Sequence, residues 1–368
     1  MFSKQEIERY NRHIILPEIG LAGQEKLKQA KVLVIGAGGL GCPILQYLTA
    51  AGVGKIGICD FDFVDTSNLQ RQILYSISDI GKPKAELAAK RLSAINPFVE
   101  FKVFTQMLKK ENVLEIFTGY DVIVDGSDNF PTRFLINDAC VILKKPLVFG
   151  AIYKFEGQVT VFNYNGGPTY RCMVPEEPSQ SEAPSCSQVG VIGAIPGLIG
   201  CYQALEAIKI ITGIGTVMSG KLMLIDSLSL MHNFIQISRN AKTAKIKKLG
   251  NYGDLCKEQY PDIKQIEPED LQKLLIEKKA RVIDIRESTV FDQYHIESEN
   301  IPIAELLKNT NRIPKMEKTV ILCEIGNNSQ AIIETLKKDA EFENLFNLNG
   351  GIQAWISKKL PVISKGNI

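Results

Sequence analysis

The feature that most constrains this chain is a glycine-rich turn directly after a short apolar run. Residues 31–41 read Lys-Val-Leu-Val-Ile-Gly-Ala-Gly-Gly-Leu-Gly, and residues 42–51 have the composition of a helix. The pattern predicts a strand, a tight turn and a helix N-terminus whose free N–H groups attract an anion. Four glycines let the backbone approach a phosphate: Gly36, Gly38, Gly39 and Gly41. The turn predicts a nucleotide site but selects neither the nucleotide nor the chemistry.

Length and composition bound the class of protein. The 368 residues are enough for two domains, and a hydrophobic share of 45% is ample for their cores. A net charge of +2 gives no indication of a nucleic-acid surface. The first residues lack an apolar signal core and no uninterrupted apolar run reaches about 18 residues, so we expect a soluble cytoplasmic protein without a membrane partner. Eight cysteines without a C-x-x-C pair make a disulfide framework unexpected.

Short apolar runs alternate with helical stretches along most of the chain. An amphipathic arm over residues 1–30 precedes strands expected at 32–35, 56–59, 100–104, 122–124, 146–150, 157–162 and 221–225, with a helix over 195–212. This alternation predicts an α/β fold: a Rossmann-like, mainly parallel sheet with flanking helices. A Lys-rich linker and a smaller α/β unit follow. We therefore expect domains at 1–240 and 263–368, joined by a linker at 241–262.

Polar and charged residues gather where the expected strands end. Asp60 closes the second strand, 24 residues after Gly36, where an acid usually holds ribose hydroxyls. Further candidates follow in the next loop, in the next helix start and after the fourth strand: Asp62, Asp65, Asn68, Arg71, Gln72, Lys84, Asp128 and Asn129. Because the carboxyl ends of parallel strands meet at one edge of a sheet, we expect these residues to surround one ligand.

The charges in this set favour a triphosphate over a dinucleotide. The hydride-transfer site of a NAD(P)-dependent oxidoreductase does not need Arg71, Lys84 and an acid together. A triphosphate with Mg²⁺ does, because the cations offset phosphate charge and an acid such as Asp128 holds the metal. Taken singly, Arg71 and Lys84 are ordinary surface charges. Only their co-occurrence at the strand ends predicts a site.

An ordered set of motifs over residues 7–238 resembles the ThiF/MoeB/HesA adenylyltransferases, relatives of the ubiquitin-activating enzymes, and among them the MoeB and MoeZ type that serves molybdopterin synthase. The matching segments are Arg9–His13, the glycine turn, Asp60–Asp62, Ser67–Gln72, Gly81–Lys84, Asp128–Asn129, Gly157–Val161 and Leu205–Lys209. The resemblance implies binding of ATP and Mg²⁺. It also implies attack by the C-terminal glycine carboxylate of a small ubiquitin-like protein on the α-phosphate, which yields an acyl-adenylate and pyrophosphate.

The same resemblance assigns roles to single residues. It implies that Arg12 acts from the partner subunit of a homodimer, and that Arg71, Lys84 and Asp128 contact the phosphates and the metal. The cations would offset the repulsion between an attacking carboxylate and a phosphate, while Mg²⁺ on Asp128 draws charge onto the departing pyrophosphate. A surface arginine paired with a neighbouring glutamate is the alternative for Arg12.

Two cysteines lie in loops that suggest chemistry. Cys186 ends a loop rich in proline and serine over residues 174–188. The resemblance implies that, in some members of the family, a cysteine at this place takes part in covalent transfer or in an acyl persulfide relay. An inert loop cysteine is the alternative.

The second cysteine, Cys323, belongs to a segment over residues 263–366 that resembles a rhodanese domain. The matching pieces are Val282–Glu287, His295–Ile296, Asn300–Pro302, Leu322–Ser329, Asn349–Trp355 and Leu360–Val362. The C-x-x-G-x-x-S turn predicts Cys323 at a strand end, facing backbone N–H groups that stabilise a thiolate or a persulfide. Rhodaneses often carry a basic residue after this cysteine. Here Glu324 would repel anionic thiosulfate and favour a protein persulfide as the sulfur donor.

A further departure from the family concerns zinc. The resemblance implies that many members hold a structural Zn²⁺ with two C-x-x-C pairs. Here the first pair is reduced to Thr169-Tyr-Arg-Cys172, and no pair occurs in residues 233–262. Because tetrahedral zinc needs four N or S ligands, we expect no structural zinc and a different tether near Cys172.

Together the two resemblances predict an adenylyltransferase fused to a rhodanese. It would adenylate the Gly-Gly tail of a sulfur carrier of the MoaD or ThiS type and help turn the carboxylate into a thiocarboxylate. The sulfur would come from a persulfide donor such as a cysteine desulfurase. The sequence leaves open whether the carrier serves molybdopterin synthesis, thiamine thiazole synthesis or tRNA thiolation. A non-catalytic or adenylation-only recruiter of a ubiquitin-like partner, with an inactive rhodanese, is the alternative.

Overall fold

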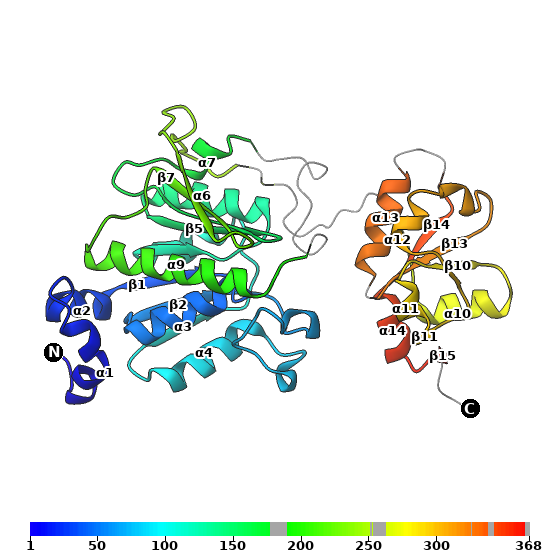
Figure 1. The fold of residues 1–368 in the computed structure, drawn as a ribbon, viewed down its shortest axis with the longest axis horizontal. Helices are drawn as coiled ribbons and strands as arrows, with labels where there is room; N and C mark the ends of the chain where they lie inside the picture. The colour runs from blue at the N-terminus through cyan, green and yellow to red at the C-terminus, as the bar shows by residue number, and fades with distance from the viewer. Residues whose placement is uncertain (177–189, 251, 253–262, 325, 338–341, 365–368) are drawn as a thin grey trace. The chain divides into compact units, whose positions relative to one another are not determined.

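The computed structural model describes residues 1–176, 190–250, 252, 263–324, 326–337 and 342–364. The chain divides into two compact units, Met1–Leu255 and Cys256–Ile368 (Figure 1). This boundary falls within the segment 241–262 predicted to link the domains. Ala244 and Tyr252 of that segment are buried, so its first part packs on the first unit.

The first unit is built on a sheet with strand order β3-β2-β1-β4-β5-β6-β7-β8. Its strands are β1 (Lys31–Ile35), β2 (Lys55–Cys59), β3 (Glu100–Phe104), β4 (Val122–Asp125), β5 (Leu147–Tyr153), β6 (Glu156–Phe162), β7 (Lys221–Asp226) and β8 (Met231–Gln236). β1 to β5 pair in parallel, and β5 to β8 pair antiparallel. The predicted mainly parallel α/β fold is confirmed. The strand order reverses between β1 and β4, and open parallel sheets bind ligands at the carboxyl side of such a point.

Alternation along β1 shows how the sheet is covered on both faces. Val32 and Val34 enter one apolar core with side chains of α3, α4 and α9, whereas Leu33 and Ile35 enter a second core with α5 and α6. The helices of this unit are α1 (Lys4–Ile14), α2 (Gly20–Gln29), α3 (Gly41–Ala51), α4 (Lys84–Ile95), α5 (Val113–Thr118), α6 (Phe130–Leu143), α7 (Tyr170–Met173) and α9 (Ala194–Thr212), with short 3₁₀ turns at Thr66–Asn68 and Ile77–Asp79. A strand buried on both faces reads as a continuous apolar run, which is why β1 is visible in the sequence.

Two elements of the first unit differ from simple sequence patterns. β8, which the sequence pattern did not predict, is an edge strand with every residue exposed, so it lacks the alternation that marks a half-buried strand. Among the described residues, α9 is the helix that is long and apolar enough to span a membrane by length and composition. It packs against α3, β5 and β6 in the way of a core helix.

The second unit contains a smaller parallel sheet with strand order β12-β10-β13-β14-β9. Its strands are β9 (Lys264–Ile266), β10 (Arg281–Asp284), β12 (Glu299–Asn300), β13 (Thr319–Leu322) and β14 (Leu345–Leu348), and β11 (Tyr294–His295) pairs with β15 (Ile363–Ser364). Its helices are α10 (Pro268–Ile276), α11 (Ser288–Phe291), α12 (Ile303–Leu306), α13 (Asn327–Lys337) and α14 (Gly351–Ser357), with a 3₁₀ turn at Thr310–Arg312. Two apolar clusters cover the two faces of this sheet.

Candidate active site

The glycine turn after β1 is tight enough to exclude side chains at two positions. Gly36 has a φ of +87°, and a Cβ on Gly41 would lie 2.0 Å from the Gly36 carbonyl oxygen. A Cβ on Gly36 would also meet the carbonyl oxygen of Gly126, in the loop after β4, at 2.8 Å. The loops after β1 and β4 therefore lie against each other at the predicted edge, because both contribute glycines to their contact.

Asp60, at the end of β2, holds this turn in place. Its carboxylate accepts hydrogen bonds from the backbone N–H of Ala37 at 2.7 Å and of Asp62 at 2.8 Å. Burial raises the pKa of Asp60 above its ordinary value, although these two hydrogen bonds and Lys84 oppose that effect. The Tyr75 hydroxyl also supports the turn, because it donates a hydrogen bond to the Ala37 carbonyl oxygen at 2.8 Å.

Lys84 begins α4 beside the same turn and is nearly buried. Its ammonium group forms an ion pair with Asp62 at 2.7 Å, in which the Lys84 side chain is 5% exposed and that of Asp62 is 60% exposed. The backbone N–H of Lys84 also donates to the Asp62 carbonyl oxygen, at 2.9 Å. The pair joins the loop after β2 to the start of α4.

Arg71, Gln72 and Asn68 occupy the loop that covers the glycine turn. Arg71 lies beside Gly39, and its guanidinium donates to the Ser67 carbonyl oxygen at 3.0 Å. Among the residues that the structure describes, Arg71 has no carboxylate partner. Gln72 lies against Gly38 and is 4% exposed, and its side-chain carbonyl oxygen is buried without a hydrogen-bond partner. This loop therefore presents an uncompensated cation and an unsatisfied acceptor near the turn.

Asp128 and Asn129 form the loop between β4 and α6. Asn129 caps α6 by accepting from the Thr132 N–H at 3.0 Å, and its amide donates to the exposed Asp128 carboxylate at 3.4 Å. The described residues contain no group of three or more His, Cys, Asp or Glu that could hold a metal ion by themselves. A magnesium ion that arrives with a triphosphate needs only one or two protein carboxylates, so the donor set around Asp128 fits that ion.

Two buried residues that the sequence analysis did not assign hold the Asp128 loop. The fully buried Asp125 carboxylate accepts from the Ser127 N–H at 2.8 Å and from its hydroxyl at 2.6 Å. Arg133 donates to the Ser127 carbonyl oxygen at 3.2 Å, and its guanidinium lies over the rings of Phe130 and Phe149. Burial raises the pKa of Asp125, an effect that Arg133 and Ser127 oppose. In the sequence, these two residues could have been found from the segment Asp125-Gly-Ser-Asp128 and from an arginine five residues beyond Asp128.

Arg12 is the one cation of the predicted set that the structure places elsewhere. It lies exposed on α1, where the neighbouring Arg9 donates to the Ile95 carbonyl at 2.9 Å and Tyr10 accepts from Asn96 at 2.9 Å. These contacts fix α1 at the C-terminal end of α4, whereas Lys84 begins that helix. A helix of 12 residues is about 18 Å long, so Arg12 lies at the opposite edge of the sheet from its own glycine turn.

The second unit places Cys323 in a cradle of hydrogen-bond donors. Cys323 follows β13 directly and is 3% exposed. Its sulfur accepts from the Gly326 N–H at 3.2 Å and from the Ser329 hydroxyl at 3.2 Å. Gly326 has a φ of +90°, which allows the loop to turn the Gly326 N–H toward the sulfur. The cradle can stabilise negative charge on a thiolate or a persulfide.

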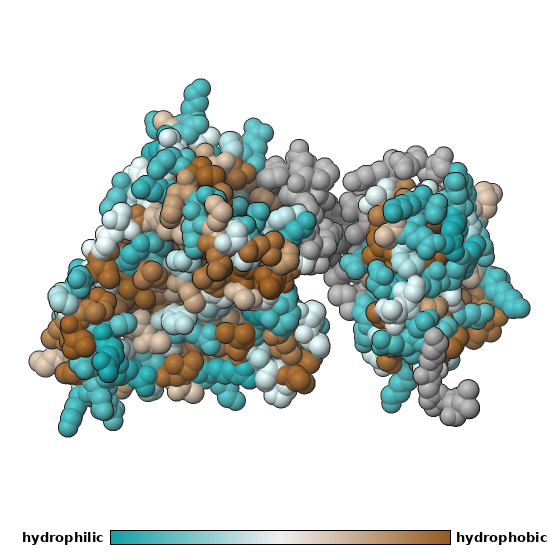
Figure 2. All heavy atoms as spheres, in the orientation of Figure 1, coloured by the Kyte–Doolittle hydropathy of each residue, from teal (hydrophilic) through white to brown (hydrophobic). Residues whose placement is uncertain are grey.

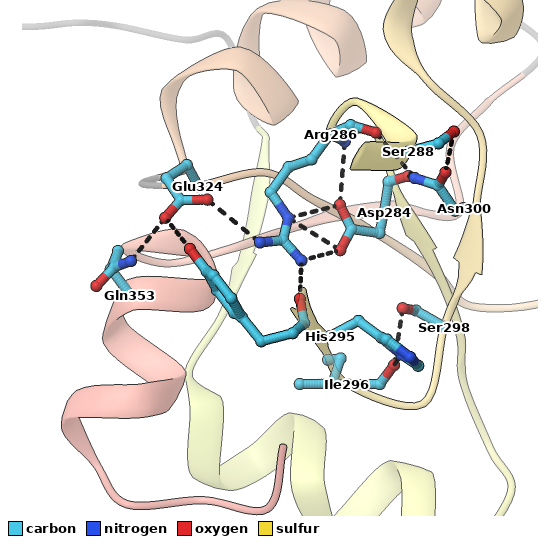
Figure 3. A network of polar contacts seen from close by, with 10 residues as sticks. Asp284, Arg286, Ser288, His295, Ile296, Ser298, Asn300, Glu324 and Gln353 are labelled. Atoms are coloured by element: carbon cyan, nitrogen blue, oxygen red, sulfur yellow. Dashed lines mark hydrogen bonds and ion pairs between the residues drawn. The ribbon is translucent and has the colours of Figure 1, made fainter. Parts of the chain in front are cut away.

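Glu324 points into a network of donors (Figure 3). Its carboxylate accepts from the Tyr294 hydroxyl at 2.7 Å, from the Gln353 amide at 2.6 Å and from Arg286 at 3.3 Å. Arg286 is in turn held by Asp284 at 2.7 Å. Burial acts to raise the pKa of Glu324, but the three hydrogen bonds and Arg286 together lower it. The charge of Glu324 is therefore compensated within this network, which ties the loop beside Cys323 to α14.

Cys186, the other candidate nucleophile, lies outside the described residues. Cys172 is described, and its sulfur is surrounded by donors. It accepts from the backbone N–H groups of Thr169 at 3.4 Å and Asn240 at 3.3 Å, and from the Thr243 hydroxyl at 3.7 Å. Burial acts to raise the pKa of Cys172, but these hydrogen bonds together lower it.

Comparison with protein-family models agrees with the two units. A model described as the ThiF family matches residues 10–246, and one described as a rhodanese-like domain matches residues 267–358. The solved structure of E. coli MccB with ATP is similar with a TM-score of 0.57 and 22% identity, covering 63% of this chain and 72% of that one. That likeness supports the fold alone.

Three curated relatives are similar at the level of sequence. A probable adenylyltransferase/sulfurtransferase MoeZ from Mycobacterium tuberculosis is 40% identical, covering 98% of this chain and 95% of the relative. An adenylyltransferase and sulfurtransferase MOCS3 from Drosophila sechellia is 38% identical, covering 98% of this chain and 85% of its own. A sulfur carrier protein adenylyltransferase from Thermus thermophilus is 50% identical, covering 66% of this chain and 91% of its own.

Proposed function

The chain belongs to the ThiF family and carries a C-terminal rhodanese-like domain, and from this premise we propose that it adenylates the C-terminal glycine of a small ubiquitin-like sulfur carrier and then transfers sulfur to it. The observation that carries the proposal is the convergence at one sheet edge of the glycine turn, the buried Lys84, Arg71 and the Asp128 loop. The names of the relatives support both activities.

ATP would lie across the carboxyl ends of β1, β2 and β4. The glycine turn would receive phosphate oxygens, Arg71 and Lys84 would offset their charge, and Asp60 and Asn68 would line the nucleoside side of the site. Asp128 would hold Mg²⁺, which supplies charge stabilisation for the departing pyrophosphate when it is bound. An oxygen of the carrier carboxylate attacks the α-phosphorus, and the bond from that phosphorus to the oxygen bridging it to the β-phosphorus breaks. Acyl-adenylate and pyrophosphate result.

Sulfur transfer would use Cys323. A persulfide donor, such as a cysteine desulfurase, loads a terminal sulfur onto the Cys323 thiolate. That sulfur attacks the carbonyl carbon of the acyl-adenylate and AMP leaves, which joins carrier and enzyme through an acyl disulfide. A second thiol, from Cys186 or from an external thiol, cleaves the S–S bond by exchange and releases the thiocarboxylate.

We also propose that the working form is a homodimer, because Arg12 cannot serve its own site from the opposite edge of the sheet. Figure 2 shows apolar residues gathered on the near face of the first unit. Exposed apolar side chains on α2, α3 and α9 and directly after α1 include Ile15, Leu16, Leu21, Tyr47, Leu198 and Leu205. A second copy covering α2, α3 and α9 would bury them and bring its Arg12 to this chain's phosphates. The free thiols of such an enzyme suit the cytoplasm.

ATP–pyrophosphate exchange tests the first half of the proposal. The full-length protein is incubated with ATP, Mg²⁺, labelled pyrophosphate and each small Gly-Gly-tailed protein of the same organism. We expect exchange with at least one of these proteins, and loss of exchange when its terminal glycine is removed. Nicotinamide binding without exchange would replace the proposal with an oxidoreductase. Tight binding of the carrier without exchange would replace it with a recruiter.

A further inference from the structure

The family resemblance implies a structural zinc site with two C-x-x-C pairs, and the described residues of this chain do not fit one. Two segments with the spacing of C-x-x-C pairs meet at the sulfur of Cys172: Thr169 to Cys172, and Asn240 to Thr243. Only one of these four positions carries sulfur, and none carries histidine. Because tetrahedral zinc takes four N or S side-chain ligands, the set lacks three of them.

The contacts around Cys172 form a closed arrangement without a metal. The Thr169 hydroxyl and the Cys172 sulfur lie 3.4 Å apart, in addition to the three donors described above. Thr169 is fully buried, so its hydroxyl is shielded from water. The Cys172 sulfur therefore lies at the centre of the group, where it contacts Thr169, Asn240 and Thr243.

Two further contacts brace the same junction on either side. Arg239 donates to the carbonyl oxygens of Gly166 and Gly167, both at 2.8 Å, which fastens the segment after β8 to the segment before α7. On the other side, Asp138 accepts two hydrogen bonds from Arg171, at 2.8 and 2.7 Å, and one from Tyr252 at 2.9 Å. An open hollow of about 760 Å³ borders Cys172 and residues 235–241.

We propose that Thr169, Cys172, Asn240 and Thr243 form a metal-free joint in place of the zinc site that the family resemblance implies, with the Cys172 sulfur as the shared acceptor at its centre. The joint holds the segment after β8 to α7. The proposal is independent of adenylation and of sulfur transfer, because it concerns only how the first unit is held together.

The test measures metal content and thermal stability of the full chain, purified without metal-affinity resin. We expect the wild-type protein to contain no stoichiometric zinc and to melt at the same temperature with and without a chelator. The combined variant Thr169→Cys, Asn240→Cys, Thr243→Cys should bind about one zinc per chain. It should also give a thiolate-to-metal absorption band with Co²⁺ and melt at a lower temperature once a chelator is added.

Two outcomes would overturn the proposal directly. One is about one zinc per wild-type chain, and the other is a folded combined variant that binds no more metal than the wild type. If the combined variant does not fold, the melting temperature of the single variant Cys172→Ala tests the proposal instead. We expect it to melt about 2–4 °C lower than the wild type, while the control Cys201→Ala, at a half-exposed cysteine outside the joint, melts within about 1 °C of it. Equal melting of the two single variants would contradict the joint.

Discussion

At the scale of single residues, the site is defined by which cations already have partners. Lys84 is buried and shares an ion pair with the exposed Asp62, whereas Arg71 donates to the Ser67 carbonyl and has no carboxylate partner among the described residues. Arg71 therefore carries a positive charge that a phosphate can compensate. This arrangement suits a site that is filled and emptied by a triphosphate in each cycle.

Lys84→Ala should lower carrier-dependent ATP–pyrophosphate exchange by about 100-fold or more, because it removes a preorganised cation from the phosphates. The matched control is Lys82→Ala, which removes an exposed lysine two residues away whose ammonium donates to the Ser78 carbonyl. We expect the control to stay within about threefold of the wild type. Equal exchange by the two variants, with equal thermal melting, would contradict the role of Lys84.

Glu324 gives a prediction for pH. Its pKa is lowered in the folded protein, so the stability it contributes is present above its unfolded pKa and is lost as pH falls through the folded value. We expect the melting temperature of the second unit to fall as pH decreases from about 5 to about 3, and to fall less steeply in Glu324→Gln. Differential scanning calorimetry of both proteins measures this, and parallel curves would rule out Glu324 as a source of the slope.

At the scale of elements, the active-site loops depend on residues buried beneath them. Asp125 and Arg133 hold Ser127 from two sides, and the loops after β1 and β4 meet through Gly36 and Gly126. Asp128 is exposed, so its position depends on the backbone that these contacts fix. Arg133 therefore acts through Asp128 and is a positioning residue.

Arg133→Lys should raise the Mg²⁺ concentration needed for half-maximal exchange by about tenfold, because residues behind a metal ligand typically contribute 10–100-fold to metal affinity. Arg171→Lys is the control, since Arg171 is also paired within the first unit, to the buried Asp138, which lies ten residues beyond Asp128 on α6. It should change melting without changing the Mg²⁺ requirement. The same Mg²⁺ requirement in Arg133→Lys as in the wild type would argue against positioning.

The burial of each element explains whether the sequence alone predicts it. β1, β2, β4 to β7 and α9 are predictable because mostly buried strands and a core helix leave apolar runs. β3 has no buried residue, but alternating apolar residues mark it in the sequence. β8 is not predictable, since all of its residues are exposed. The residues around the glycine turn are predictable from their places at strand ends. The surroundings of Cys172 are not, because two of its donors are backbone N–H groups, one of them 68 residues away, and the network around Glu324 depends on side-chain contacts of Tyr294 and Gln353 that no sequence pattern reveals.

At the scale of the whole molecule, the proposed function uses two chains for each working site. Arg12 lies at the far end of α4 from Lys84, so we expect Arg12 to reach a phosphate only in the site of a second chain. Arginines supplied in this way can contribute about 10³-fold or more in phosphoryl transfer.

Mixing Arg12→Ala with Asp128→Ala should restore exchange that neither variant has alone. In the heterodimer one site combines an intact Asp128 with the partner's intact Arg12, and the other site has neither. We expect about one quarter of wild-type activity after random subunit exchange, since half of the dimers would then have one working site of two. If heterodimers form and stay inactive, Arg12 does not act across the interface.

Mass spectrometry of the carrier can show whether one chain both activates the carrier and supplies it with sulfur. After incubation with ATP, Mg²⁺, a persulfide donor and a reducing thiol, the wild-type protein should increase the carrier mass by the difference between sulfur and oxygen. Cys323→Ala should keep ATP–pyrophosphate exchange at the wild-type rate and yield little or none of this product. Thiocarboxylate formed by Cys323→Ala at the wild-type rate, or by the wild-type protein without ATP, would contradict the account.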